Sequence, residues 1–183
     1  MKIKTHGALA LLAAAALLAG CVSQGTYNQE VQKATTYQQL DARLKAELAA
    51  EQAQITQLQN VVRVTLANGI LFPEGGWELN AAGKATLANL APVLKTLTGQ
   101  KIEIKGYTDN VPIGPELRAR FPNNVDLSKA RAQSVADFLV AQGVPPSIIT
   151  VSGFGDAQPV ASNDTAQGRS KNRRVVMDII EAK

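Results

Sequence analysis

Cysteine and histidine are almost absent from this chain: among 183 residues the only cysteine is Cys21 and the only histidine is His6. A single cysteine cannot form a disulfide within the chain, so stability must come from ordinary packing. If the segment before Cys21 is removed, no imidazole remains, which excludes His/Cys zinc sites and Ser-His-Asp triads. Aromatic residues make up only 4% and cannot supply a stacking platform. We therefore expect no catalytic residue, no metal site and no cofactor.

The length allows one domain plus an appendage, at about 150 residues per domain.

Strong positive charge is also missing. The formal net charge of +4 includes Lys2 and Lys4, so the chain without residues 1–20 carries +2, which is +4 less those two lysines. With few aromatics and no long basic run, this charge gives little support to nucleic-acid binding, and we expect no nucleic-acid partner.

The N-terminus has the organisation of a signal peptide. Two lysines precede an unbroken apolar run of twelve residues, 8–19. Twelve helical residues reach about 18 Å, short of the roughly 30 Å hydrocarbon core of a bilayer, so a permanent span is disfavoured. The run ends in small residues directly before Cys21, which resembles the lipobox of bacterial lipoproteins. The alternative is an ordinary secretory signal followed by an incidental cysteine.

The lipobox resemblance implies cleavage after residue 20 and acylation of Cys21, which would become the first residue. Several acyl chains at about 0.8 kcal/mol per CH₂ give a durable membrane anchor. Val22 stands where an aspartate would favour retention in the inner membrane, so the resemblance points to the outer membrane. We thus expect residues 1–20 to be a lipoprotein signal peptide and the membrane to be a partner through the lipid on Cys21.

Residues 21–60 contain no proline, and apolar side chains recur there at spacings of three, four and seven between residues 27 and 62. This pattern predicts one long amphipathic helix. Its narrow apolar stripe suits either a self-associating coiled coil, making a homo-oligomer through residues 27–58, or a helix packed on another surface. A helix of this length spans roughly 50 Å and suits a spacer.

From residue 61 the pattern changes to alternating strands and helices. Apolar residues at every second position predict strands around residues 62–66, 102–104, 148–151 and 175–179. Between them, helices are expected from Asn80 past Pro92, which should bend the helix, and from about 126 to 142. A polar loop is expected over 109–124 and a short helix before the last strand. The predicted fold class is α+β, with helices on one mixed sheet over residues 61–183 and a long helix before it.

One charged residue lies among the apolar positions of the second helix. On a helical wheel Arg131 falls with Leu127, and a guanidinium there needs acceptors from the protein or from a ligand. Asp109 follows the end of a strand, a common ligand position. Together they could bind a zwitterion, with the ammonium on Asp109 and the carboxylate on Arg131. They could equally form a structural salt bridge, or Asp109 could be only a turn residue.

Four ordered motifs resemble the C-terminal domain shared by outer-membrane protein A, Pal and the stator protein MotB: GYTDN at 106–110, DLSKARA at 126–132, GFG at 153–155 with Pro159, and GR at 168–169 with NRRV at 172–175. The resemblance covers roughly residues 61–180. It implies a domain that grips peptidoglycan noncovalently, through the amine and carboxylate of meso-diaminopimelate. The resemblance implies that Asp109 binds the amine and Arg131 binds the carboxylate. Secondary contacts are implied for Thr108, Asn110 and Leu127.

The chain also departs from that family's pattern. Tyr107 stands where histidine is frequent, and the loop over 111–124 is longer than in Pal and more like that of MotB. No membrane-spanning proton-carrying helix is present, so a stator role is rejected. At least one of Arg173 and Arg174 is expected to form a structural bridge to a nearby carboxylate.

These observations predict an outer-membrane lipoprotein, with its domain in the periplasm, that tethers the membrane to the cell wall and is not an enzyme. The alternative is an assembly or signalling adaptor that acts through its N-terminal helix, with wall binding only for localisation.

Overall fold

The computed structural model describes residues 27–28, 31–32, 35, 53–58 and 61–182. The described residues up to 35 are helical and exposed, in agreement with a helix in this part of the chain. The expected signal peptide, the lipidation site at Cys21 and most of the expected self-association stripe lie outside the described residues. Within the part that the structure describes, no helix is long and apolar enough to cross a membrane.

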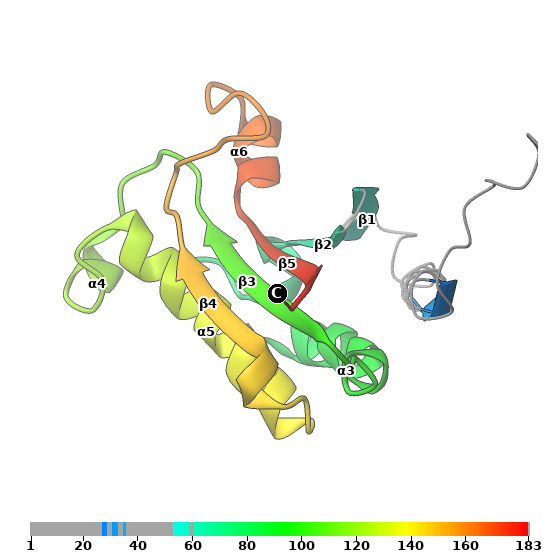
Figure 1. Ribbon diagram of the computed structural model, residues 1–183. Helices are drawn as coiled ribbons and strands as arrows, with labels where there is room; N and C mark the ends of the chain where they lie inside the picture. Colours follow the sequence, from blue (N-terminus) through cyan, green and yellow to red (C-terminus); the bar gives the residue numbers. More distant parts are fainter. Residues whose placement is uncertain (1–26, 29–30, 33–34, 36–52, 59–60, 183) are drawn as a thin grey trace, which may run out of the picture. The chain divides into compact units, whose positions relative to one another are not determined.

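A mixed five-stranded sheet forms the centre of the fold (Figure 1). Its strands are β1 (Ala53–Leu58), β2 (Val61–Ala67), β3 (Gln100–Tyr107), β4 (Ile149–Gly153) and β5 (Arg174–Glu181), and their order in the sheet is β1-β2-β5-β3-β4. Only β3 and β4 run parallel; the other neighbours are antiparallel. The predicted α+β class and the four predicted strands are confirmed, and the last strand in the chain lies at the middle of the sheet.

The strand β1 corrects the predicted extent of the N-terminal helix, because Ala53–Leu58 pairs antiparallel with β2 instead of continuing a helix. Ile55 lies opposite Val64 and packs against the core. The β-branched pair Ile55 and Thr56 favours a strand, and Leu58 lies opposite Val61 in the pairing. The spacing of Ile55 from Leu58 fits a helix equally well, so apolar spacing alone could not separate the two.

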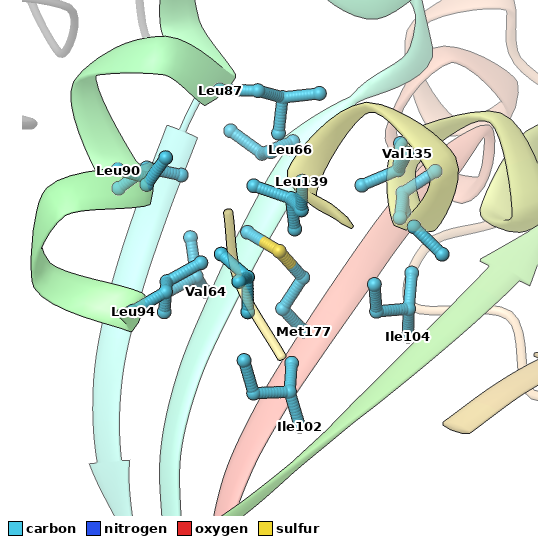
Figure 2. Packing of buried hydrophobic residues seen from close by; sticks show 14 of the residues in the cluster. Val64, Leu66, Leu87, Leu90, Leu94, Ile102, Ile104, Val135, Leu139 and Met177 are labelled. Atoms are coloured by element: carbon cyan, nitrogen blue, oxygen red, sulfur yellow. The ribbon is translucent and has the colours of Figure 1, made fainter. Parts of the chain in front are cut away.

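Two helices cover one face of the sheet, α3 (Ala81–Leu94) and α5 (Asn124–Ala141). Asn80 caps α3 as predicted, its side chain accepting from the Gly83 N–H at 2.7 Å, and α3 continues through Pro92. Asn123 caps α5, so this helix begins two residues earlier than expected. Figure 2 shows the core between sheet and helices, with Met177 of β5 among apolar side chains from α3, α5 and the strands.

Shorter helices connect these elements. They are α2 (Asn68–Leu71), α4 (Pro115–Arg118), the 3-10 helix η2 (Pro146–Ile148) and α6 (Ala166–Asn172). The segment 109–124, expected to be a polar loop throughout, contains α4 and is held by a second small apolar cluster centred on Phe121. The predicted short helix before the last strand is α6.

Candidate functional site

A cavity of about 670 Å³ lies where β3 ends, and four parts of the chain far apart in the sequence line it. They are the segment 68–80, the segment 108–117, one side of α5, and α6 with the residue that follows it. Thr108, Asp109, Leu127 and Arg131 all contribute to its lining. The structure therefore brings four of the five expected site residues together. Asn110 is exposed and is not among the lining residues.

Asp109 is held in the first turn after β3 and is only 7% exposed. Its Oδ1 accepts a hydrogen bond from the Val111 N–H at 3.1 Å, and its Oδ2 accepts from Arg173 Nη1 at 2.6 Å. The preceding residue is fixed as well, because the Thr108 N–H donates to the Gly155 carbonyl at 2.7 Å. These contacts fix the orientation of the carboxylate, and its ion pair is with Arg173 rather than with Arg131.

Arg131 projects from α5 into the same cavity and is also only 7% exposed. Its Nε donates to the Gly76 carbonyl at 2.8 Å, and its guanidinium lies 5.7 Å from the centre of the Phe72 ring. Among the described residues, its two terminal nitrogens have no hydrogen-bond or salt-bridge partner. The result is a buried cation without a directly paired carboxylate.

The electrostatics of Arg131 follow from this geometry. The pKa of Arg131 is lowered to about 10: burial is the largest cause, the positive charge of Arg173 adds to it, and the nearby Asp109 carboxylate offsets part of the effect. A largely buried cation that faces a second cation is stabilised by any anion that enters the cavity. This arrangement favours binding of a carboxylate.

Close packing of α5 against the sheet places Arg131 at this position. A Cβ atom on Gly106 of β3 would overlap the Ser128 carbonyl of α5, and one on Gly153 of β4 would overlap the α5 backbone. Only glycine permits this approach. The Ser128 hydroxyl also accepts from the Gly155 N–H at 3.0 Å, which joins α5 to the turn after β4.

The two arginines of the NRRV motif have different surroundings. Arg173 bridges to Asp109, which confirms a carboxylate bridge for one of the pair, but the bridge lies in the cavity wall. Arg174 lies 3.8 Å from the centre of the Tyr107 ring and donates to the carbonyls of Asn172 and Gln158. Tyr107 in turn stacks on Phe154. The tyrosine that departs from the family pattern therefore anchors β5 outside the cavity.

The cavity also has polar lining residues that were not predicted as site residues, and two of them are Arg169 and Asn68. Arg169 of α6 lines it, with Nη1 bonded to the Asn163 carbonyl at 2.8 Å. Asn68 lines it from the start of α2 and is 5% exposed; within the described chain its Oδ1 is the only buried side-chain polar atom without a hydrogen-bond partner. The GR pair at 168–169 was a signal for the former, whereas no sequence pattern distinguished Asn68.

Comparison with known proteins identifies the family of the chain. The model of the OmpA family matches residues 71–173. The chain is 36% identical over 135 residues to the Escherichia coli protein named "Probable lipoprotein YiaD", covering 74% of this chain and 58% of YiaD. It is 40% identical over 118 residues to the peptidoglycan-binding protein ArfA of Mycobacterium tuberculosis, covering 64% of this chain and 34% of ArfA. The chain thus spans less than two thirds of either relative.

A third relative and two solved structures extend the comparison. The outer-membrane lipoprotein YfiB of Pseudomonas aeruginosa is 35% identical over 136 residues, covering 71% of this chain and 77% of YfiB. A MotB-like protein from Desulfovibrio vulgaris superposes with a TM-score of 0.73 at 27% identity, covering 83% and 95% of the two chains. The cell wall anchor of the T6SS from Pseudomonas aeruginosa gives 0.70 at 31% identity, covering 78% and 96%.

Proposed function

Since the chain belongs to the OmpA family, we propose that it binds peptidoglycan noncovalently in the cavity that contains Asp109 and Arg131. The names of two similar proteins support this ligand: ArfA is called peptidoglycan-binding, and the T6SS protein is called a cell wall anchor. The proposed role is binding rather than catalysis.

The observation that carries the proposal is the buried guanidinium of Arg131, whose terminal nitrogens lack a partner among the described residues. A ligand carboxylate on Arg131 would supply the missing anion through charge-assisted hydrogen bonds. An adjacent ammonium would be attracted to the Asp109 carboxylate, which keeps acceptor capacity beyond its bonds to Arg173 and Val111. In the peptidoglycan stem peptide, the free end of meso-diaminopimelate carries both groups on one carbon.

Membrane attachment is the second part of the proposal. The lipobox-like sequence before Cys21 supports a lipid anchor, and the similarity to YfiB, named an outer-membrane lipoprotein, supports a place in the outer membrane. A chain held by lipid at one end and by the wall at the other would tether the two. Many weak contacts along a polymer give avidity, so each single contact can be modest.

Cosedimentation with purified sacculi tests the wall-binding part. The full chain in detergent is compared with Asp109→Asn and Arg131→Gln, and with the matched controls Asp137→Asn and Lys129→Gln on exposed positions of α5. We expect the wild type and both controls to pellet with sacculi and both cavity variants to stay in solution while retaining a wild-type circular dichroism spectrum. Equal pelleting of all five proteins would overturn the proposal.

The adaptor alternative is favoured by one observation, the exposure of apolar side chains on helical residues, 60% for Tyr27 and 46% for Val31. Self-association through the part of this stripe that precedes β1 would cover such side chains. Chemical crosslinking of the full chain and of a Leu44→Asp, Leu48→Asp double variant tests it. If the double variant loses its crosslinked oligomers and its function in the cell but still binds sacculi, the adaptor is favoured. Unchanged crosslinking would exclude self-association through this stripe.

A further inference from the structure

The cavity contains more positive charge than a single zwitterion can balance. Its described lining includes three guanidinium groups, on Arg131, Arg169 and Arg173, against two carboxylates, on Asp109 and Glu74. An ammonium and a carboxylate bound to Asp109 and Arg131 add no net charge, so an excess of one positive charge remains. Because Arg131 would be occupied by the first carboxylate, the excess lies on the α6 side of the cavity.

Helix α6 presents this charge as a pair. Arg169 and Arg173 are four residues apart, and the Arg173 N–H donates to the Arg169 carbonyl at 3.0 Å, so their side chains lie on the same face of the helix. Each uses only one terminal nitrogen in the protein, Arg169 on the Asn163 carbonyl and Arg173 on Asp109. Within the described residues the remaining N–H groups of both guanidinium groups have no partner.

We propose that Arg169 and Arg173 form a second carboxylate subsite, which makes the cavity selective for stem peptides with a second free carboxylate beside the zwitterion. This inference rests on the proposed function and goes further, because it names the charge state of the ligand. Two groups of the stem have the required chemistry, the α-carboxylate of the γ-linked D-glutamate and the second carboxyl group of diaminopimelate where it ends the stem. Conversion of the bound group to an amide removes its charge and replaces an acceptor oxygen with N–H donors, which guanidinium groups cannot pair with.

Three peptides with an acetylated N-terminus test the proposal: L-Ala-γ-D-Glu-meso-diaminopimelate, its glutamyl α-carboxamide and its C-terminal carboxamide. All three keep the zwitterionic end. Affinities for the full chain are measured by isothermal titration calorimetry. We expect the free peptide to bind about tenfold more tightly than one of the two amides, the size expected for one charge-assisted hydrogen bond at a half-buried site. The amide that binds weakly identifies which carboxylate occupies the subsite.

Variants of α6 show whether its arginines cause the discrimination. Arg169→Gln should bind the free peptide and the discriminated amide with nearly equal affinity, whereas Lys171→Gln, which removes the same charge from an exposed position of α6 outside the cavity lining, should discriminate like the wild type. Arg169→Lys, which keeps the charge, should retain part of the discrimination.

The outcomes separate the two proposals. Equal binding of all three peptides by the wild type would overturn the second subsite and leave the proposed function standing, and this comparison needs no variant to fold. Equal weakening of all three peptides in Arg169→Gln would also overturn it, because a purely structural arginine acts in that way. If none of the peptides binds, the proposed function itself fails.

Discussion

Replacement of Arg131 by methionine should make the protein more stable and unable to bind its ligand. The reason is the cost of keeping a guanidinium charged where it is 7% exposed and has no paired carboxylate among the described residues. Lowering of the Arg131 pKa to about 10 corresponds to an energetic cost of about 3 kcal/mol for the charged form in the folded state. Methionine replaces the aliphatic part of the arginine side chain with a flexible apolar one and carries no charge.

Losses offset part of this gain. The Gly76 carbonyl loses its hydrogen bond from Nε, at about 1 kcal/mol, and the contact with the Phe72 ring contributes up to about 1 kcal/mol more. The net expectation is a free energy of unfolding about 1 to 2 kcal/mol higher in Arg131→Met. For a domain of this size that raises the midpoint of thermal unfolding by roughly 3 to 8 °C.

The dependence on pH has a definite sign. Below the folded pKa of about 10 the guanidinium is protonated in both the folded and the unfolded state, so the full cost is present in the wild type. As pH rises through about 10, the folded state releases the proton first, and the stability of the wild type relative to Arg131→Met should increase. The difference in the free energy of unfolding between the wild type and Arg131→Met should therefore be constant from about pH 6 to 9 and become smaller above that range.

Urea unfolding followed by circular dichroism measures the free energies, and sacculus cosedimentation measures binding on the same preparations. Lys129→Met is the matched control, since it removes a charge from an exposed position of the same helix and should be close to neutral in both assays. If Arg131→Met is less stable than the wild type at neutral pH, the guanidinium is satisfied within the protein and the reasoning from an uncompensated charge is wrong.

Three further substitutions test the scaffold by urea unfolding. Burial alone would raise the pKa of Asp178, but hydrogen bonds from Arg63 and Lys105 lower it, so Asp178→Asn should cost about 1 to 3 kcal/mol at neutral pH. That deficit should begin to shrink as pH falls below 3.8 and should vanish only below the lowered pKa of folded Asp178, where its carboxyl is protonated in the wild type. Gly106→Ala should cost about 1 to 3 kcal/mol and weaken sacculus binding, because its Cβ would push α5 away from β3. Asn80→Ala should cost about 1 kcal/mol through loss of the α3 cap, without affecting binding.

The parts of the fold that local patterns determine could be predicted. Alternating apolar residues marked β2 and β3, and Asn80 marked the start of α3, because these signals act within a few residues of the chain. The end of the N-terminal helix could not be predicted in the same way. Ile55 and Leu58 fit both a helical stripe and a strand, and the choice depends on pairing with β2, which is a tertiary contact. The short helix α4 was hidden by the polar and proline-rich composition of its segment.

The candidate site could likewise be predicted only in part. The position of Arg131 on the buried side of α5 follows from its helical register with Leu127, so its need for an acceptor could be inferred from the sequence. The identity of that acceptor could not be inferred. Asp109 lies close enough to raise the pKa of Arg131, but it forms its salt bridge with Arg173. Similarly, Asn110 follows Asp109 directly, yet it faces solvent after the chain turns.

The pairing of Asp109 with Arg173 depends on the order of the strands. β5 inserts between β2 and β3 and runs antiparallel to β3, with Tyr107 opposite Arg174. The residue before β5 therefore lies next to the residues that follow β3, although 64 positions separate Arg173 from Asp109 in the chain. A sequence gives no direct measure of this register. Once the last strand is known to be central and antiparallel to β3, however, the residue before it must lie beside the turn that contains Asp109, so the place of Arg173 in the cavity wall follows from topology.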